Sequence, residues 1–175
     1  MVLNMLIAGF GGQGVLFMGK VAAYTAMVEE KYVSWLPSYG PEMRGGTANC
    51  SVCIDDEPIG CPIVLEPETL VVLNAPSYDK FVDAVQPGGK IFIDSSLIEA
   101  KCTRTDIDAY YIPCTQMAKD EELSGLANII MLGKVLRETH FTTFEVLCEA
   151  MKKCVPAKKA HLLDANLKAL KLGYD

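Results

Sequence analysis

The stretch Leu6–Lys20, LIAGFGGQGVLFMGK, joins two apolar runs through a cluster of glycines. Leu3–Ala8, before the glycines, predicts a buried strand, and Val15–Val28, after them, predicts a long apolar helix. Small residues recur at helical spacing in that helix and predict one face that lies close against a sheet: Gly19, Ala22, Ala23 and Ala26.

The glycine turn GFGGQG, Gly9–Gly14, has the G-x-G-x-x-G spacing of a dinucleotide-binding turn. Gly9 would permit the tight turn, Gly11 would let a ligand approach the backbone, and Gly14 would let helix and strand pack closely. Gly12 and Gln13 complete the turn, and free amides at the helix start favour an anion.

The acidic residue that would bind a ribose about 20 residues further on is missing. The second strand there reads Val33-Ser34-Trp35-Leu36, and none of these side chains is acidic. Two interpretations stay open. The turn is either a dinucleotide site, or a structural turn that contacts some other anion or a neighbouring subunit.

Further strands are predicted at Lys31–Leu36, Thr47–Ile54, Leu70–Leu73, Lys90–Asp94 and Ala109–Ile112. Asp55–Glu57 predicts a turn into a short strand near Ile59. The pattern also predicts a helix over Ser77–Val85 and a helical last third. A capping box is predicted at Thr142 and Glu145. The final helix is predicted from Pro156 to Gly173 and carries three leucines on one face: Leu163, Leu167 and Leu170. Strands that alternate with helices predict one α/β, Rossmann-like three-layer domain over residues 1–175, with a mostly parallel sheet and a helical carboxyl-terminal part.

The composition limits the classes of partner. The chain has 16 basic and 22 acidic residues and a net charge of −6, which argues against a nucleic-acid partner. We find no apolar run that would span a membrane and no signal-peptide pattern. Seven cysteines without an export signal predict reduced thiols and a cytoplasmic protein.

The cysteines and histidines do not form a recognisable catalytic or metal motif. Cys50 and Cys53 have CxxC spacing, but they lie in a predicted strand, where residues three apart point to opposite faces. Buried thiols are favoured over a zinc or iron–sulfur site, for which Cys61 would give at most a third ligand. His140 and His161 lie at predicted helix ends or surfaces. We therefore predict no catalytic residue and no metal site in this chain.

The loop Pro37–Gly46, PSYGPEMRGG, is too rich in proline and glycine for a helix or strand. It follows the second predicted strand, so we expect it to lie beside the glycine turn at the carboxyl edge of the sheet, where ligands bind. Arg44 could bind a carboxylate or phosphate through two hydrogen bonds. Glu42 could hold the Arg44 side chain in position or pair with a partner chain. Alternatively, Glu42 and Arg44 pair with each other and hold only the shape of the loop.

Three segments together resemble the gamma subunit of 2-oxoacid:ferredoxin oxidoreductases, the gamma-domain family of pyruvate ferredoxin oxidoreductase. They are GFGGQG at Gly9–Gly14, LPSYGPEMRGGTANCSV at Leu36–Val52 and LANIIMLG at Leu126–Gly133. The central segment is the longest and most specific, and it is closer to the 2-oxoglutarate or branched-chain type than to the pyruvate type. The resemblance covers essentially the whole chain.

The resemblance implies a complex that oxidatively decarboxylates a 2-oxoacid, 2-oxoglutarate being favoured, to an acyl-CoA and reduces ferredoxin. It implies thiamine diphosphate, magnesium and [4Fe–4S] clusters in partner subunits, none of them in this chain, and coenzyme A as a substrate. The candidate partners are alpha, beta and delta subunits, with ferredoxin reached through the complex. The isolated chain is expected to be inactive and to help in assembly and CoA access.

The resemblance places two candidate loops at a subunit junction or on the route of CoA. Their residues are Gly9, Gly11, Gly12, Gln13 and Gly14 in the first loop, and Tyr39, Glu42, Arg44, Gly45 and Gly46 in the second. A freestanding Rossmann-type nucleotide-binding protein or NAD-linked enzyme is the alternative, and a plain scaffold is a third. Because half of the residues are apolar, we also expect a homodimer when the chain is made alone.

Overall fold

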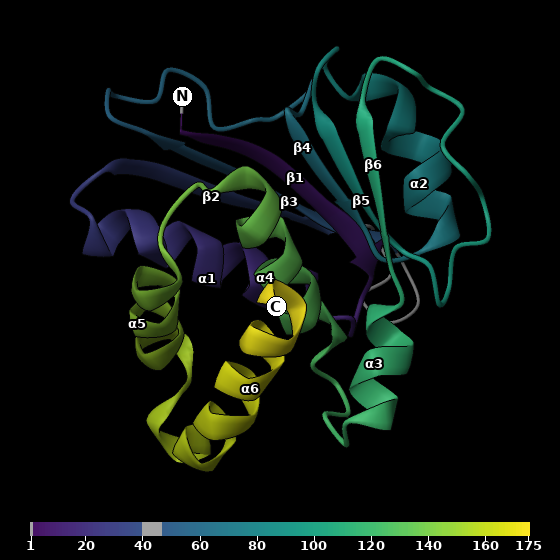
Figure 1. The fold of residues 1–175 in the computed structure, drawn as a ribbon. Helices are drawn as coiled ribbons and strands as arrows, with labels where there is room; N and C mark the ends of the chain where they lie inside the picture. The colour runs from purple at the N-terminus through teal and green to yellow at the C-terminus, as the bar shows by residue number, and fades with distance from the viewer. Residues whose placement is uncertain (1, 40–46) are drawn as a thin grey trace.

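A computed structural model describes residues 2–39 and 47–175, and within them six strands form one sheet (Figure 1). The order of the strands across the sheet is β2-β3-β1-β4-β5-β6. Every strand has a counterpart in the sequence prediction, with ends that differ by at most three residues. The strands are β1 (Leu3–Phe10), β2 (Tyr32–Tyr39), β3 (Thr47–Asp55), β4 (Thr69–Val72), β5 (Lys90–Asp94) and β6 (Asp108–Ile112).

The predicted α/β class is confirmed, and the sheet is mixed. Within the described residues, β1–β4, β4–β5 and β5–β6 are parallel pairs, whereas β1–β3 and β2–β3 are antiparallel. β1 and β2 run in the same direction, but β3 lies between them, so the first strand–helix–strand unit is split. The ends of β1 and β2 still lie at one edge, where Phe10 pairs with Thr47 and Tyr39 pairs with Ala48.

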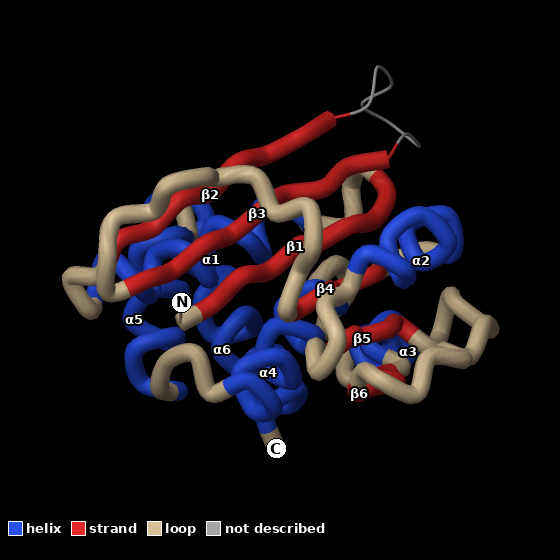
Figure 2. The backbone as a smooth tube through the Cα atoms, turned by 90° about the horizontal axis from the view of Figure 1, so that it is seen from above, coloured by secondary structure: helices blue, strands red, loops and turns tan. Residues whose placement is uncertain are grey.

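The helices lie mainly on one face of the sheet (Figure 2). A large core joins that face to the helices α1 (Val15–Val28), α3 (Cys114–Asp120), α4 (Ala127–Thr139), α5 (Phe144–Cys154) and α6 (Leu163–Tyr174). A smaller core on the other face holds α2 (Ala75–Phe81) over β4 and β5. Over β1 and β3, that second face is covered by the segment 56–68, which crosses the strands as a loop.

The helix α1 lies close to the sheet, as its small residues predict. Gly19 and the alanines at 22, 23 and 26 are all buried. A Cβ atom at Gly19 would lie 3.1 Å from Trp35 Nε1 of β2 and even closer to Cys50 Sγ of β3. The absence of a side chain at Gly19 therefore sets how closely α1 approaches these two strands.

The two cysteines of the CxxC motif lie on opposite faces of β3, as the strand prediction requires. Cys50 belongs to the core beneath α1, and Cys53 belongs to the core on the other face. Both thiols are buried. Their side chains therefore cannot bind one metal ion together in this strand, because they point away from each other.

The predicted strand near Ile59 is wrong, because the described residues 56–68 contain no strand. Prolines at 58, 62 and 67 remove backbone donors from this segment, which a strand pairing would need. The segment is instead held by single hydrogen bonds to its surroundings. Val64 N donates to Ser51 Oγ at 3.1 Å, and Gln86 donates from Nε2 to Glu66 O at 2.7 Å and from N to Pro67 O at 3.0 Å.

Several helix ends differ from the prediction. α2 begins at Ala75 rather than Ser77, because Asn74 Oδ1 accepts from Ser77 N and caps the helix, and a 3₁₀ turn, η1 (Val82–Ala84), follows α2. The cap of α5 is Thr143, whose Oγ1 accepts from Val146 N, so the capping box assigned to Thr142 is wrong by one residue.

Among the described residues, no helix has the length and apolar character needed to cross a membrane.

The predicted final helix, Pro156–Gly173, consists of two helical segments in the structure. A 3₁₀ segment, η2 (Ala157–Leu162), follows Pro156, and α6 begins only at Leu163. α6 then crosses α4 at two glycines, Gly133 and Gly173. A Cβ atom at Gly173 would overlap the backbone carbonyl of Ile130, so the two helices touch through their main chains.

We expect Gly173→Ala to lower the free energy of unfolding by about 3 kcal/mol or more, because the added methyl group meets backbone rather than a movable side chain. Urea unfolding followed by circular dichroism measures this change. Gly60→Ala is the matched control, because no atom lies within 4 Å of the added Cβ. Equal stability of the two variants would contradict the close crossing of α4 and α6.

Candidate functional site

The glycine turn lies between the end of β1 and the start of α1, as the sequence predicts. Gly12 and Gly14 have positive φ angles of 96° and 73°, which glycine adopts without strain. Gly9 is crowded, because a Cβ atom there would lie 2.6 Å from Gln13 Oε1 and 3.1 Å from Leu73 Cβ. Gly14 is the N-cap of α1, and no side chain caps this helix.

Gln13 ties the turn to the neighbouring strand. Its Oε1 accepts from Phe10 N at 2.6 Å, and its Nε2 donates to Leu73 O at 2.8 Å, just beyond β4. Both ends of the amide are therefore engaged, one on β1 and the other at the end of β4. The side chain closes the turn, a role that the glycine spacing alone did not reveal.

A hollow of about 330 Å³ lies on one side of the turn. Its lining combines the turn with the first residues of α1 and the start of β3: Phe10, Gly11, Gly12, Gly14, Val15, Leu16, Phe17 and Ala48. The first amides of a helix have no partner inside the helix, so this wall offers hydrogen-bond donors to an anion. Such an end also favours negative charge through the helix dipole.

The second predicted loop is attached at this same edge. The predicted start of this loop at Pro37 is wrong, because residues 37–39 continue β2 and pair with residues 48–50 of β3. The connection therefore leaves β2 after Tyr39, which pairs with Ala48, and enters β3 at Thr47, which pairs with Phe10. The ends of the loop therefore lie near the glycine turn, as expected for loops at one edge of the sheet. The predicted site residues Glu42, Arg44, Gly45 and Gly46 lie outside the described residues.

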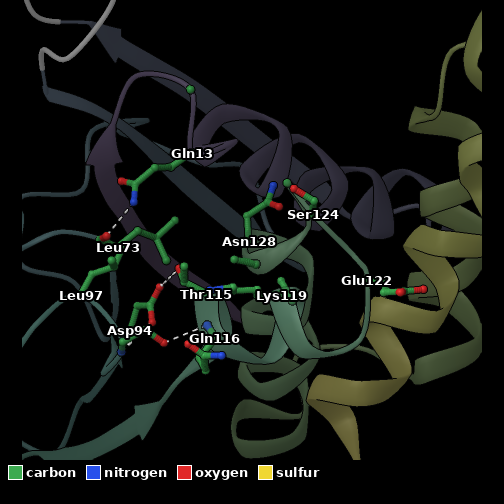
Figure 3. A pocket seen from close by; sticks show the side chains of 15 residues that line it. Gln13, Leu73, Asp94, Leu97, Thr115, Gln116, Lys119, Glu122, Ser124 and Asn128 are labelled. Carbon is green, nitrogen blue, oxygen red and sulfur yellow. Dashed lines mark hydrogen bonds between the residues drawn. The ribbon is translucent and has the colours of Figure 1, made fainter.

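A larger hollow of about 800 Å³ lies on the other side of the turn (Figure 3). It is bounded by the turn, by the carboxyl ends of β4 and β5, by α3 and by the start of α4. The chain leaves β1 toward α1 on one face and leaves β4 toward α2 on the other, so the hollow lies at the switch point of the sheet, where ligands of α/β domains bind. Its lining residues are Gly12, Gln13, Leu73, Asp94, Ser96, Leu97, Thr115, Gln116, Ala118, Lys119, Glu122, Ser124, Gly125, Ala127 and Asn128.

Asp94 lies at the floor of this larger hollow, at the end of β5, and is almost fully buried. Its Oδ2 accepts from Thr115 Oγ1 at 2.5 Å, and its Oδ1 accepts from Ser96 N at 3.0 Å. The lining of the hollow also includes one cation, Lys119, and one further acid, Glu122. The wall therefore suits polar, uncharged groups better than a phosphate.

Asn128 joins α4 to the glycine turn. Its Nδ2 donates to Gly14 O at 3.0 Å, and a Cβ atom at Gly14 would overlap the same amide. Asn128 lies in the LANIIMLG segment, so one of the three resembling segments packs directly on another. Asp94, Thr115 and Asn128 were not predicted as site residues from the sequence, where the one local signal was that Asp94 ends a predicted strand.

The arrangement beside β1 differs from that of a dinucleotide-binding domain. There, the strand after the first helix pairs with the first strand, and its acidic end binds the ribose. Here β3 takes that position and runs antiparallel to β1, and β2 is one strand further away. The described ranges also hold no group of three or more His, Cys, Asp or Glu side chains placed to bind a metal ion.

Fold and site together define an α/β domain with a split first unit, in which a glycine turn separates two hollows at the carboxyl edge of the sheet. The chain matches the model of the family described as pyruvate ferredoxin/flavodoxin oxidoreductase over residues 4–175. It belongs to that family.

Relatives of the chain are subunits of such enzymes. The chain is 42% identical over 175 residues to the ketoisovalerate oxidoreductase subunit VorA of Methanothermobacter thermautotrophicus, a match that covers 99% of this chain and 36% of that one. It is 37% identical over 172 residues to the 2-oxoglutarate synthase subunit KorC of Methanocaldococcus jannaschii. That match covers 97% of this chain and 90% of KorC. The resemblance to a family of 2-oxoacid oxidoreductase subunits is thereby confirmed.

A solved structure has the same fold. The 2-oxoglutarate:ferredoxin oxidoreductase from Magnetococcus marinus, with 2-oxoglutarate, coenzyme A and succinyl-CoA bound, superposes with a TM-score of 0.86 at 25% identity. The superposition covers 98% of this chain and 30% of that chain. The present chain thus spans about a third of VorA and of the solved chain, but most of KorC.

We expect Gln13→Ala to lower the free energy of unfolding by about 1–3 kcal/mol, because Phe10 N and Leu73 O both lose their partner. Thermal and urea unfolding measure the change. In the control Gln116→Ala, the side chain loses only an exposed contact with Asp120, and the loss should stay within about 0.5 kcal/mol. If both variants match the wild type, Gln13 does not hold the turn.

The thiols should differ strongly in reactivity. Burial raises the pKa of Cys50 to about 12 and that of Cys154 to about 11, and burial also raises the pKa of Cys114. A raised pKa lowers the thiolate fraction at pH 8, and the thiolate is the reactive form. Iodoacetamide at pH 8 should therefore label the exposed Cys61 first and spare these buried thiols until the chain unfolds. Mass spectrometry of the labelled peptides reports the order, and early labelling of Cys50 would contradict it.

Proposed function

We propose that this chain is the gamma subunit of a thiamine diphosphate-dependent 2-oxoacid:ferredoxin oxidoreductase. The complex would convert a 2-oxoacid and CoA to an acyl-CoA and CO₂, and would pass the two electrons to ferredoxin. The observation that carries the proposal is the match to KorC, a separate subunit of 2-oxoglutarate synthase, of which this chain covers 90%. We favour 2-oxoglutarate as the substrate, with a branched-chain 2-oxoacid second, since VorA is named for ketoisovalerate.

The redox chemistry would belong to partner subunits. Thiamine diphosphate supplies carbanion stabilisation when bound, and the surrounding protein orients the substrate and excludes water. The cysteines of this chain do not fit an iron–sulfur cluster, because Cys50 and Cys53 point to opposite faces of β3. Within the described residues, no three His, Cys, Asp or Glu side chains are placed to bind one metal centre. Thiamine diphosphate, magnesium and [4Fe–4S] clusters are therefore proposed for the alpha, beta and delta partners.

This chain would contribute to assembly and to the access of CoA. The amino end of α1 offers free amides beside the smaller hollow, and the loop that carries Arg44 is attached at the same edge. Anionic groups of CoA would bind there, whereas its uncharged arm suits the larger hollow around Asp94 and Thr115. In this proposal, Tyr39, Glu42, Gly45 and Gly46 flank Arg44 on the CoA route.

The proposed unit comprises residues 1–175 acting as one gamma domain in the cytoplasm. When the chain is made without its partners, we propose that it self-associates as a homodimer. Sedimentation velocity at high concentration measures this directly. A clean monomer would contradict the homodimer but not the assignment to the complex.

An anaerobic pull-down of the tagged chain from its native source tests the assignment, with the partners identified by mass spectrometry. The proposal expects thiamine-binding and iron–sulfur subunits in the recovered complex, and activity with a panel of 2-oxoacids. The alternative is a freestanding nucleotide-binding protein or NAD-linked enzyme. Recovery of the chain alone, with NAD bound, would favour that alternative.

We expect Arg44→Ala to raise the apparent KM for CoA in the assembled enzyme by roughly tenfold or more, because a charge-assisted hydrogen bond is lost. Arg44→Lys keeps the charge but not the two-pronged geometry, so its KM should lie between those of the wild type and Arg44→Ala. Steady-state kinetics at saturating 2-oxoacid measures both. An unchanged KM with failed assembly would make the loop a subunit interface instead.

A further inference from the structure

The face of β2 and β3 that points away from α1 carries exposed apolar side chains. Val33 packs in the core beneath α1 and Trp35 lies beside Gly19 of that helix. Successive residues of a strand point to opposite faces, so Tyr32 and Leu36 lie on the other face. Tyr32 is 50% exposed and Leu36 is 39% exposed.

The segment 56–68 adds two more apolar side chains to this face. Val64 is buried against β3, where its N donates to Ser51 Oγ. Ser51 is the register partner of Leu36 on β2, so Val64 is bonded to the β3 residue next to Leu36. Its neighbours Ile63 and Leu65 are 53% and 77% exposed. We call Tyr32, Leu36, Ile63 and Leu65 the apolar patch.

The patch has an acidic border. The segment that crosses this face carries the exposed acids Asp56, Glu57, Glu66 and Glu68. The sequence has no lysine or arginine between Arg44 and Lys80, so this segment has no basic side chain of its own. A protein surface that complements the patch would be apolar at its centre and basic at its border.

The same charges disfavour a second copy of this chain as the occupant. A two-fold contact through the patch would place each acidic border against the other, and like charges across an interface cost affinity. Extension of the sheet by pairing of two β2 edges is also disfavoured, because Pro37 lies within β2 and has no N–H to donate. The free edge is thus partly blocked to β-pairing.

We propose that the apolar patch is the docking surface for a larger subunit of the same oxidoreductase, one that presents an apolar centre with a lysine- and arginine-rich border. This inference rests on the proposed function. The relatives support a protein occupant, because in VorA and in the solved chain this domain occupies only 36% and 30% of a longer polypeptide. The domain is therefore found both as a separate subunit and as part of one chain with further protein.

The test uses the anaerobically purified complex and its separated partner subunits. Leu65→Asp should raise the Kd for the partner subunits by roughly tenfold or more, since the most exposed apolar side chain of the patch is replaced by a charge. The side chain of Leu65 is 77% exposed, so the fold should survive the change. Leu162→Asp in η2, on the helical side of the sheet, is the matched control and should leave the Kd within twofold of the wild-type value.

Two further measurements locate the contact. Glu66→Lys with Glu68→Lys should slow association and weaken its dependence on salt, because the acidic border would no longer steer a basic surface. Hydrogen exchange should show that backbone amides of residues 32–38 and 61–66 gain protection when the complex forms. Protection elsewhere, with normal binding by Leu65→Asp, would overturn the docking surface.

The outcomes separate the two proposals. If wild-type chain recovers no thiamine-binding subunit, the proposed function fails. If wild-type chain and Leu65→Asp recover the partner subunits equally, the function stands and the docking surface fails. If Leu65→Asp instead converts a dimer of the isolated chain to a monomer without changing the Kd for partner subunits, the patch binds a second copy, and the inference is overturned.

Discussion

The structure depends on the close approach of the glycine turn to its surroundings. Gly9 leaves room for the side chain of Gln13, which joins β1 to the end of β4, and Gly14 leaves room for the amide of Asn128 on α4. A side chain at either glycine would displace one of these amides. The turn therefore fixes β1, β4, α1 and α4 relative to one another, and it forms the wall that separates the two hollows.

This constraint explains why a turn with dinucleotide spacing need not bind a dinucleotide. Close packing and a tight turn already require glycine at both ends of the motif, whatever ligand is present. The insertion of β3 between β1 and β2 removes the strand end that would hold a ribose. The edge retains the amino end of α1 and a polar hollow at the switch point, and the proposed route of CoA rests on these two features.

Local patterns were sufficient to predict most elements. The apolar run of α1 and its small residues predicted both the bounds of the helix and its packed face. Alternation along β3 predicted that Cys50 and Cys53 point to opposite cores. The short helix α3 was missed, and so was the order of the strands, because pairing of β3 with both β1 and β2 depends on contacts far apart in the sequence. Asp94, Thr115 and Asn128 meet in one hollow for the same reason, and no spacing rule brings them together.

In the proposed function, the chain contributes surfaces and loops to a larger enzyme, and the chemistry belongs to partner subunits. The domain is found alone in KorC and joined to further protein in VorA, so its surfaces must serve contacts in either arrangement. The most direct test of this account is a titration of the isolated, isotope-labelled chain with NADH, followed by the amide NMR signals of Gly11, Gly12 and Val15. The account predicts no saturable shift of these signals at millimolar NADH. A saturable shift confined to the glycine turn would contradict it.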